Sequence, residues 1–481
     1  MADDPSKNLP AVDAMQELWS VVDPLMGGTK AMRSAGETLL PKWPKEDAKP
    51  YTDRLNRSTL LPAYSETIAN MVGRVFAEPI TIGQDVPVQI AAYLEDIDQQ
   101  GNNIDVWAPG VFTPGLAHGL CHALVDYPST VDADGNPIVN NRADEIALGV
   151  RPYAVLVMPQ QLIGWRYTVV RGAPVLTQVR YWESVDEDDG RFDTKTTRQI
   201  RILEIGAWSV WQERQGADGK KEWAEIDRGT TSLDKIPFET FYTKRTGVMT
   251  AVPPLLELAY MNIKHWQSQS DQDNILHVAR VPLLAISGID DDSYELVIGT
   301  SNATKLPTNG KMEYVEHSGA AIEAGRQSLQ DLVDDMRLAG AKLLQKEKQV
   351  TKTATQAESE EAQEMSALQR YAGQFEDFLD RVLQLFADYM REAEGGHVKV
   401  NGNFDIDYAP EVTLPLLLNM ANAGKLSDQT LFSEVKRRGV ISDDADWEVE
   451  KQRISDQGPA LGTLTDDPQI PPAPTPAPEA E

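Results

Sequence analysis

The longest amphipathic segment of the chain runs from about residue 354 to residue 394. It begins with the capping-box pattern Thr355-Gln-Ala-Glu358, whose side chains can accept hydrogen bonds from free N–H groups of a first helical turn. A helix of this length would extend about 60 Å, and Gly395-Gly396 would end it. Such a helix must pack its apolar stripe on other helices. The residues of the stripe, three and four apart, are Met365, Leu368, Ala372, Phe375, Leu379, Val382, Phe386 and Tyr389.

Two further helices, separated by short strands, are expected before this one. Pro253-Pro254 opens the first, since proline is tolerated in a first helical turn, and the helix continues to Ala279. Residues 281–317 break into strand patterns separated by polar turns. Helical periodicity returns at Ala320 and continues to Lys346.

The middle of the first of these helices, Asn262–Asn274, is polar nearly all round. A helix buried in the core of a monomer needs an apolar face, which this segment lacks. We therefore expect it to face water or polar neighbours.

The N-terminal half combines helices with an antiparallel sheet. A helix is predicted over residues 60–76, and a second from residue 105 gives way to a short strand at 123–128. Period-two patterns with the turn signals Asp189-Gly190 and Asp218-Gly219 then predict an antiparallel sheet over residues 153–242.

The C-terminal region is expected to hold a strand-like patch at 398–408 and short helices at 415–423 and 427–438. Residues 457–481 alternate Pro, Ala, Thr and acid, which buries too little apolar surface to offset the entropy of ordering, so we expect a disordered tail.

Composition excludes several classes of function. The 481 residues include 74 Asp and Glu against 45 Lys and Arg, a net charge of −29 that argues against tight DNA binding. Cys121 is the single cysteine, so neither an intrachain disulfide nor a cysteine zinc site can form within one chain, which suits a reducing cytoplasm. No export signal or membrane span is predicted.

No enzyme, metal or cofactor motif is convincing. Gly219-Lys220 and Gly424-Lys425 lack the hydroxyl residue that a phosphate-binding loop needs next, and no G-x-S-x-G elbow occurs. His118, Cys121 and His122 would share one face of a helix like metal ligands, but their apolar flanks favour a role in packing. We therefore expect no catalytic residue, no metal and no cofactor.

Several quoted segments together resemble the portal proteins of tailed bacteriophages, from about residue 50 to residue 455. They are Tyr51-Thr-Asp-Arg-Leu55, His118-Gly-Leu-Cys-His-Ala-Leu-Val-Asp-Tyr-Pro128, Asn262-Ile-Lys-His-Trp-Gln267, Asn274-Ile-Leu-His-Val-Ala279, Tyr314-Val-Glu-His-Ser-Gly-Ala-Ala-Ile-Glu-Ala-Gly-Arg326 and Thr351-Lys-Thr-Ala-Thr-Gln-Ala-Glu358.

The resemblance implies an α+β portal fold with wing, helical stem, clip and helical crown, assembled as a ring, usually of twelve copies. The implied parts are an N-terminal arm 1–50, a wing 51–252, a stem helix 253–280, a clip 281–317, a second stem helix 318–346, a tunnel loop 347–353, a long wing and crown helix 354–396, a crown 397–456 and a Pro-rich tail 457–481.

The function implied by the resemblance is a conduit at the capsid vertex through which viral DNA is packaged and ejected. The implied partners are double-stranded DNA, the terminase large subunit, a major capsid or scaffolding protein and a head-tail adaptor, in a virion assembled in the host cytoplasm. Lys346, Lys348 and Lys352, in the expected tunnel loop and its entrance, are the candidate DNA contacts. By composition alone such a cluster is usually a solvated corner.

Two alternative interpretations remain open. A different virion structural protein, such as a head-to-tail adaptor or a minor capsid protein, would generally be shorter and would lack the clip inserted between two helices. A soluble cytoplasmic hydrolase would use scattered carboxylates and form a small oligomer or a monomer.

Overall fold

The computed structural model describes residues 4–128, 130, 138–139, 141–215, 221–279, 283–287, 311–315, 320–341, 366–404, 410–437, 440–441 and 445–457. The chain divides into two compact units, Met1–Phe404 and Asp405–Glu481. Helices and strands are mixed, which confirms the expected α+β class at that level.

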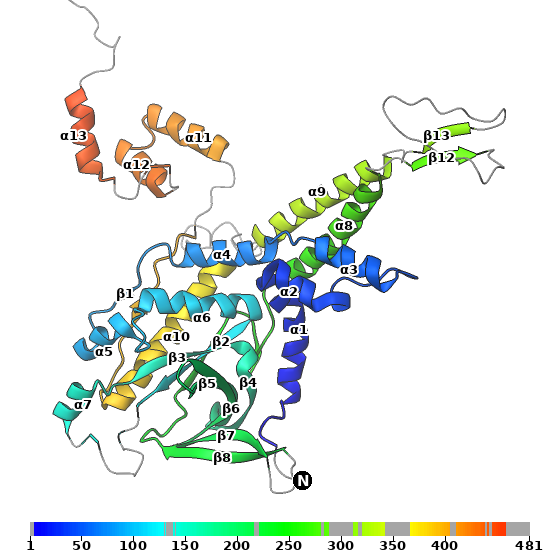
Figure 1. Cartoon of the computed structure of the whole chain (residues 1–481). Helices are drawn as coiled ribbons and strands as arrows, with labels where there is room; N and C mark the ends of the chain where they lie inside the picture. The colour runs from blue at the N-terminus through cyan, green and yellow to red at the C-terminus, as the bar shows by residue number, and fades with distance from the viewer. Residues whose placement is uncertain are drawn as a thin grey trace, which may run out of the picture. The chain divides into compact units, whose positions relative to one another are not determined.

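The elements of the first unit alternate between helical and sheet regions (Figure 1). Its helices are α1 Pro10–Met26, α2 Gly28–Ala35, α3 Ala48–Arg57, α4 Ala63–Val75, α5 Val88–Tyr93, α6 Ile104–His118, α7 Arg142–Leu148, α8 Leu256–Ala279, α9 Ala320–Ala341 and α10 Ala367–Met390, with 3-10 turns at Gly36–Thr38, Leu94–Asp96 and Pro159–Gln161. Its strands are β1 Thr81–Ile82, β2 Leu120–Asp126, β3 Tyr153–Val157, β4 Leu162–Val170, β5 Ala173–Asp189, β6 Asp193–Glu204, β7 Ala207–Gln215, β8 Lys221–Thr230, β9 Phe238–Tyr242, β10 Arg245–Gly247, β11 Thr250–Ala251, β12 Leu283–Ser287, β13 Lys311–Val315 and β14 Val398–Lys399.

Two antiparallel sheets dominate the first unit, with orders β3-β2-β9 and β4-β5-β6-β7-β8. The predicted antiparallel pairing over residues 153–242 is therefore confirmed, but the strands divide between two sheets, since β3 and β9 pair with β2. The predicted turn at Asp189-Gly190 ends β5, and Gly190 has a φ of +89°. The other predicted turn, at Asp218-Gly219, lies outside the described residues.

The central strand β2 is buried on both faces and organises the core. Phe241 of β9 packs against Phe112 of α6 and Phe375 of α10, with its ring centroid 5.2 and 4.9 Å from theirs. On the opposite face, Leu120 and Leu124 pack with the five-stranded sheet. Burying each large apolar side chain contributes about 1.5–3 kcal/mol, so this aromatic and aliphatic layer holds helices and sheets together.

The helix predicted from residue 105 ends earlier than expected. Gly119 adopts a φ of +99° directly after α6, and β2 begins at Leu120. A Cβ at this glycine would lie 2.6 Å from the carbonyl oxygen of Val252, so the close approach of that backbone also requires glycine. The switch from helix to strand follows from this one residue.

Residues 1–50, which the resemblance assigns to an N-terminal arm, include helix α1, and this helix packs into the core. Helix α1 buries Met15 and Trp19 in the cluster that also contains residues of the five-stranded sheet, and Trp19 donates to the carbonyl oxygen of His118 at 3.0 Å. The apolar spacing of α1 is helical, although the Pro-rich and polar composition of residues 1–50 conceals it.

Helix α10 is shorter than the predicted helix at both ends. Ser366 has an extended backbone and its hydroxyl accepts from the backbone N–H of Gln369 at 3.2 Å, so it caps a helix that begins at Ala367. Arg391 takes a left-handed φ of 59° and ends the helix before Gly395-Gly396. The predicted box at Thr355–Glu358 lies outside the described residues.

The stripe of α10 is buried as predicted from Leu368 to Phe386, but it does not pack on helices alone. Strand β9, together with α4, forms a large part of its contact surface. A sheet face presents the same kind of apolar surface as a helix, so the spacing alone could not identify the partner.

The second unit contains three described helices, α11 Pro410–Asn422, α12 Asp428–Arg437 and α13 Trp447–Gln457. The first two correspond to predicted helices, although α11 starts before Pro415 and includes it. The third was not predicted; Trp447 at its start lies against Phe432 of α12, with ring centroids 5.4 Å apart. The expected tail beyond Gln457 lies outside the described residues.

The segment expected as a crown, 397–456, is divided by the boundary between the units. β14 pairs with β1 of the first unit, and Val400 donates its backbone N–H to Glu376 of α10 at 2.8 Å. These bonds attach residues up to 404 to the first unit.

Candidate functional site

Helices α8 and α9 form an antiparallel pair whose connecting residues include the paired strands β12 and β13 (Figure 1). The register runs from Leu283 opposite Val315 to Ser287 opposite Lys311. The prediction of helix, strands and helix is confirmed for the described residues, while 288–310 lie outside them. We call this element the α8–α9 hairpin.

Several polar side chains in the middle of α8 are buried within the chain, where they meet polar neighbours as the sequence predicted. Asn262 is fully buried, its side-chain oxygen accepts from the backbone N–H of Tyr64, and its amide donates to the carbonyl oxygen of Leu61, both at 2.9 Å. A buried amide satisfied at both ends avoids the penalty of desolvation. Both partners come from α4 and the residues just before it, so Asn262 attaches the start of α4 to the hairpin.

A second buried polar group links α8 to α3. Arg54 is 5% exposed and makes a bidentate ion pair with Glu46 at 2.9 and 2.8 Å. Its guanidinium also stacks on Trp43 at 4.2 Å, and the Ser58 hydroxyl bonds that of Ser270 on α8 at 2.9 Å. The hydrogen bond from Arg54 lowers the pKa of Glu46 below its usual value. Arg54 and Ser58 both contact Ser270, which braces α3 on α8.

The two helices of the hairpin approach closely at Gly325. A Cβ there would collide with the side chain of Gln272, which donates to the carbonyl oxygen of Ile322 at 2.9 Å. Further along α9, Leu332 and Met336 are buried. The polar face of α8 is thus covered by α3, α4 and α9, which corrects the expectation that it cannot be buried in one chain.

The outer face of α9 is exposed and acidic. Four carboxylates stand against two arginines there: Glu323, Asp331, Asp334 and Asp335 against Arg326 and Arg337. Arg326 pairs with Glu323 at 2.6 Å and Arg337 with Asp334 at 3.1 Å, both within one turn. Exposed pairs of this kind contribute little stability. Their main effect is on the surface charge, which remains net negative.

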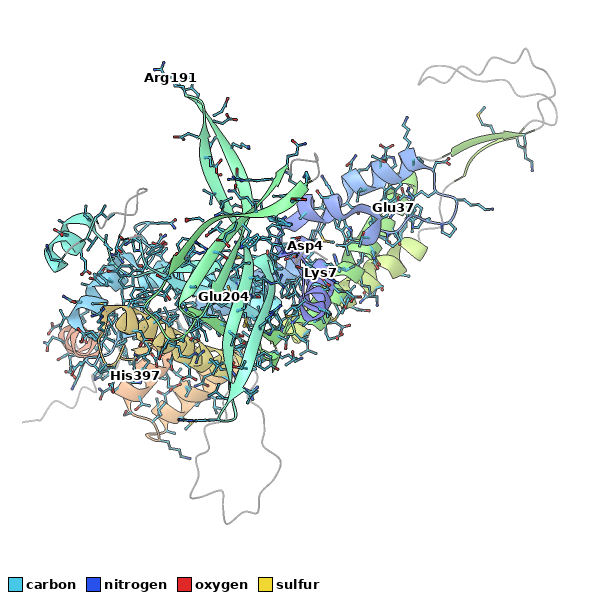
Figure 2. The ribbon with its side chains drawn as sticks, turned by 90° about the horizontal axis from the view of Figure 1, so that it is seen from below. Asp4, Lys7, Glu37, Arg191, Glu204 and His397 are labelled. Atoms are coloured by element: carbon cyan, nitrogen blue, oxygen red, sulfur yellow. The ribbon has the colours of Figure 1, made fainter. Side chains whose placement is uncertain are left out.

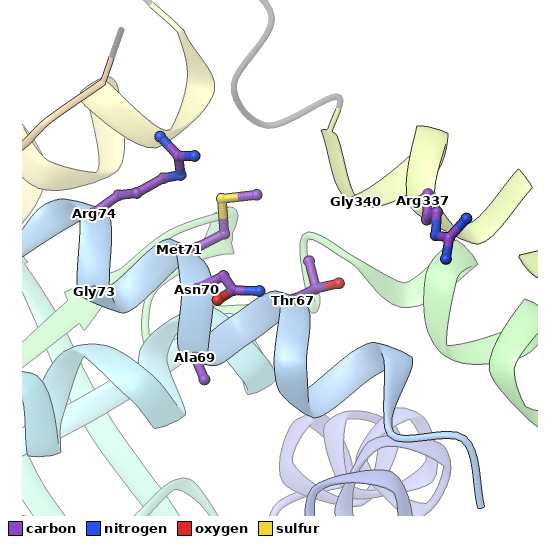
Figure 3. Close-up of a pocket in the computed structure, with 8 residues that line it drawn as sticks. All are labelled: Thr67, Ala69, Asn70, Met71, Gly73, Arg74, Arg337 and Gly340. Carbon is purple, nitrogen blue, oxygen red and sulfur yellow. The ribbon is translucent and has the colours of Figure 1, made fainter. Parts of the chain in front are cut away.

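A groove of about 670 Å³ lies between α4 and the C-terminal end of α9 (Figure 3). Arg74 of α4 and Arg337 of α9 line it, and Thr67 faces Gly340, where a Cβ would lie 3.1 Å from the threonine methyl group. Sequence reasoning did not find this groove, because its two arginines are far apart in the chain and belong to no motif.

The three candidate DNA-contacting residues, Lys346, Lys348 and Lys352, lie outside the described residues. The last described residue before them is Ala341, at the end of α9 and beside Gly340 of the groove. Their role therefore stays a prediction.

The histidines and cysteine considered as metal ligands are placed apart. His118 lies 2.8 Å from Asp23, while His122 lies 2.9 Å from Thr240 and is buried, which lowers its pKa to about 3. Cys121 is buried on the other face of β2, and burial raises the pKa of its thiol. Within the described ranges, no group of three or more His, Cys, Asp or Glu side chains is arranged to hold a metal ion. The described helices also include none long and apolar enough to span a membrane.

The comparisons with known proteins give one family match and several structural similarities. A family described as a domain of unknown function (DUF4055) matches residues 254–390, which include α8, α9 and α10. No curated protein matches the chain.

Among solved structures, the chain is similar to a chain from the neck of an empty gene transfer agent particle with C6 symmetry, at 12% identity and a TM-score of 0.39, covering 76% of this chain and 87% of that one. It is similar to a chain from the neck of the native particle with C12 symmetry, at 12% identity and a TM-score of 0.38, with coverage of 76% and 87%. It is also similar to a chain from the virion of the native particle, at 12% identity and a TM-score of 0.37, with coverage of 78% and 88%.

Proposed function

We propose that this chain is a portal subunit, which forms a ring at the capsid vertex through which viral DNA is packaged and ejected. The observation that carries the proposal is the α8–α9 hairpin with β12 and β13 between its helices, in the order that the sequence resemblance implies for stem and clip. An adaptor without strands inserted between two helices would lack this element.

In this proposal the α8–α9 hairpin is the stem, and residues 281–317 form the clip that docks the terminase and later the head-tail adaptor. The buried polar contacts from Asn262 to Leu61 and from Arg54 to Ser270 support the assignment of the stem. They brace the hairpin on α3 and α4, which lie in or next to the segment proposed as the wing. The remaining sheets and α6 belong to the wing.

The charge of the chain suits a conduit for a polyanion. Twelve copies at −29 each would carry a formal charge of about −350, and the outer face of α9 contributes exposed carboxylates. Charges within a Debye length of about 8 Å of the phosphates repel them, so DNA would slide without adhering. Lys346, Lys348 and Lys352 would supply the few weak contacts near the tunnel.

Electron microscopy of the purified chain tests the proposal. We expect class averages that show an annulus with an axial channel, and a sedimentation coefficient appropriate to a ring of about twelve copies. A chain that remains monomeric or forms only small closed oligomers, both when purified and in infected cells, would contradict the proposal and favour the hydrolase interpretation.

A further inference from the structure

The five-stranded sheet carries opposite charges at the two ends of its longest strand. β5 has 17 residues, so its ends are about 55 Å apart at 3.3 Å per residue. At one end β5 joins β6 through Gly190, Arg191 and Phe192, and at the other it joins β4 through Arg171 and Gly172. We call residues 186–193 the acidic tip and residues 166–171 the basic edge.

The acidic tip is a ribbon that the rest of the sheet does not support. β4 pairs with β5 no further than Tyr181, and β7 pairs with β6 no further than Ile200, so residues 184–189 and 193–198 pair only with each other among the described strands. Figure 2 shows Arg191 at the end of this projecting ribbon. A two-stranded ribbon alone in water is marginally stable, so an external contact would stabilise it.

The side chains of the acidic tip are unfavourable for a ribbon that is exposed to solvent without a partner. It contains five carboxylates and one arginine, and Asp189 stands directly opposite Asp193 across the ribbon, where like charges repel. Phe192 is 87% exposed. A cationic surface with an apolar component would offset both the repulsion and the exposure.

The basic edge has that composition. Arg166 and Arg171 are exposed, and no acidic residue occurs from Leu162 to Gln178. Neither arginine has an ion-pair or hydrogen-bond partner within the part of the chain that the structure describes. The basic edge also exposes three apolar side chains, with exposed fractions of 47% for Tyr167, 66% for Val169 and 51% for Val170.

The basic edge also lies on an edge strand. β4 is the first strand of its sheet, and residues near its start are covered by the N-terminal segment, where Leu9 donates its backbone N–H to Ile163 at 3.0 Å. No described residue covers Arg166–Val170 in the same way. Exposed edges of this kind readily pair with another chain.

We propose that the acidic tip of one copy docks on the basic edge of the next copy of this chain. The two surfaces lie at opposite ends of one strand, so a single copy cannot satisfy its own contact. A contact between different patches of identical chains is head-to-tail, and repeated head-to-tail contacts form a ring when the rotation from one copy to the next closes. The inference rests on the proposed ring and assigns one of its subunit contacts.

Charge reversal tests the contact. We expect Asp188→Lys with Asp189→Lys, and separately Arg166→Glu with Arg171→Glu, each to raise the protein concentration needed for rings at least tenfold, measured by sedimentation and electron microscopy. The matched control is Glu222→Lys with Asp227→Lys on β8, which changes the net charge as the first variant does on the other edge of the same sheet. We expect that control to assemble as the unaltered chain does.

Mixing the two reversed variants distinguishes lost contacts from failed folding. In an alternating ring each lysine tip would meet a glutamate edge and each unaltered tip an unaltered edge, so the mixture should assemble where neither variant does alone. Rings that form normally from each variant alone, or a mixture that fails to assemble, would overturn the inference while leaving the proposed function in place. An unaltered chain that never forms rings would overturn both.

Discussion

At the scale of single residues, the buried Arg54 and Glu46 pair is the clearest case of a charge arrangement that only the fold explains. The two side chains are 3% and 5% exposed. Breaking one partner of a buried pair leaves an uncompensated charge, whereas replacing both leaves none. Arg54 also donates to the Ser270 hydroxyl of α8 at 3.5 Å, so the buried pair lies where α3 meets the hairpin.

Arg54→Met should destabilise the first unit by about 3–5 kcal/mol, because the Glu46 carboxylate would stay buried without its partner. Chemical denaturation of both variants checks this, and Arg54→Met with Glu46→Gln should recover most of the loss. Because the pKa of Glu46 is lowered in the fold, its contribution is complete above the unfolded value of about 4.3 and is lost as pH falls through the lower folded value. Equal stabilities for the single and double variants would contradict the pairing.

For the exposed pair of His397 and Asp85, the raised pKa of His397 gives stability a pH dependence opposite in sign to that from Glu46. The hydrogen bond from His397 to Asp85, at 2.5 Å, raises the pKa of His397 and lowers that of Asp85. Asp85→Asn should bring the pKa of His397 back toward its usual value, although Asp380 still raises it. An NMR titration measures this directly, and an unchanged midpoint would argue against the contact. Any stability from the raised pKa of His397 is present at acidic pH and is lost as pH rises through that pKa.

At the scale of elements, local signals predicted the type of most helices and strands but misplaced several ends. The stripe from Leu368 to Phe386 was predicted and is buried. The start of α10, by contrast, depends on Ser366, whose hydroxyl accepts a hydrogen bond from the backbone N–H of Gln369. Helix α1 was missed because its apolar spacing lies in a segment of Pro-rich and polar composition. The partner of each apolar face was decided by packing.

Ser366→Ala should destabilise α10 by about 1 kcal/mol through loss of its N-cap, and Ser366→Thr should lose much less because it keeps the hydroxyl. Thermal unfolding of the three chains provides the measurement. If threonine were as harmful as alanine, the effect would come from packing of this buried residue and not from the cap.

At the scale of the whole molecule, the proposed ring gives the lysines near the tunnel a function that a single chain cannot. Lys346→Ala, Lys348→Ala and Lys352→Ala combined should leave rings intact while reducing the amount of DNA packaged or retained, because the chain as a whole is acidic and offers phosphates few other cations. Electron microscopy checks the rings, and the DNA content of purified particles checks packaging. A matched triple substitution of Lys7, Lys49 and Lys451 should leave packaging unchanged; unchanged packaging in the first variant would refute the role of these lysines.

The sequence by itself determined the single cysteine and the acidic charge, which are matters of composition. It also determined the periodicities and the order of helix, strands and helix in residues 253–346, since these depend on residues close together in the chain. Tertiary structure alone decided that the polar middle of α8 is buried, because Asn262 and Ser270 find their hydrogen-bond partners about 200 residues earlier in the chain. It also decided that the basic residues of β4 and of the β4–β5 turn lie far along the sheet from the acidic end of β5, because strand pairing sets where each hairpin leaves the sheet. A pattern can show that a side chain is polar, but whether it meets water or a partner depends on which distant segment folds over it.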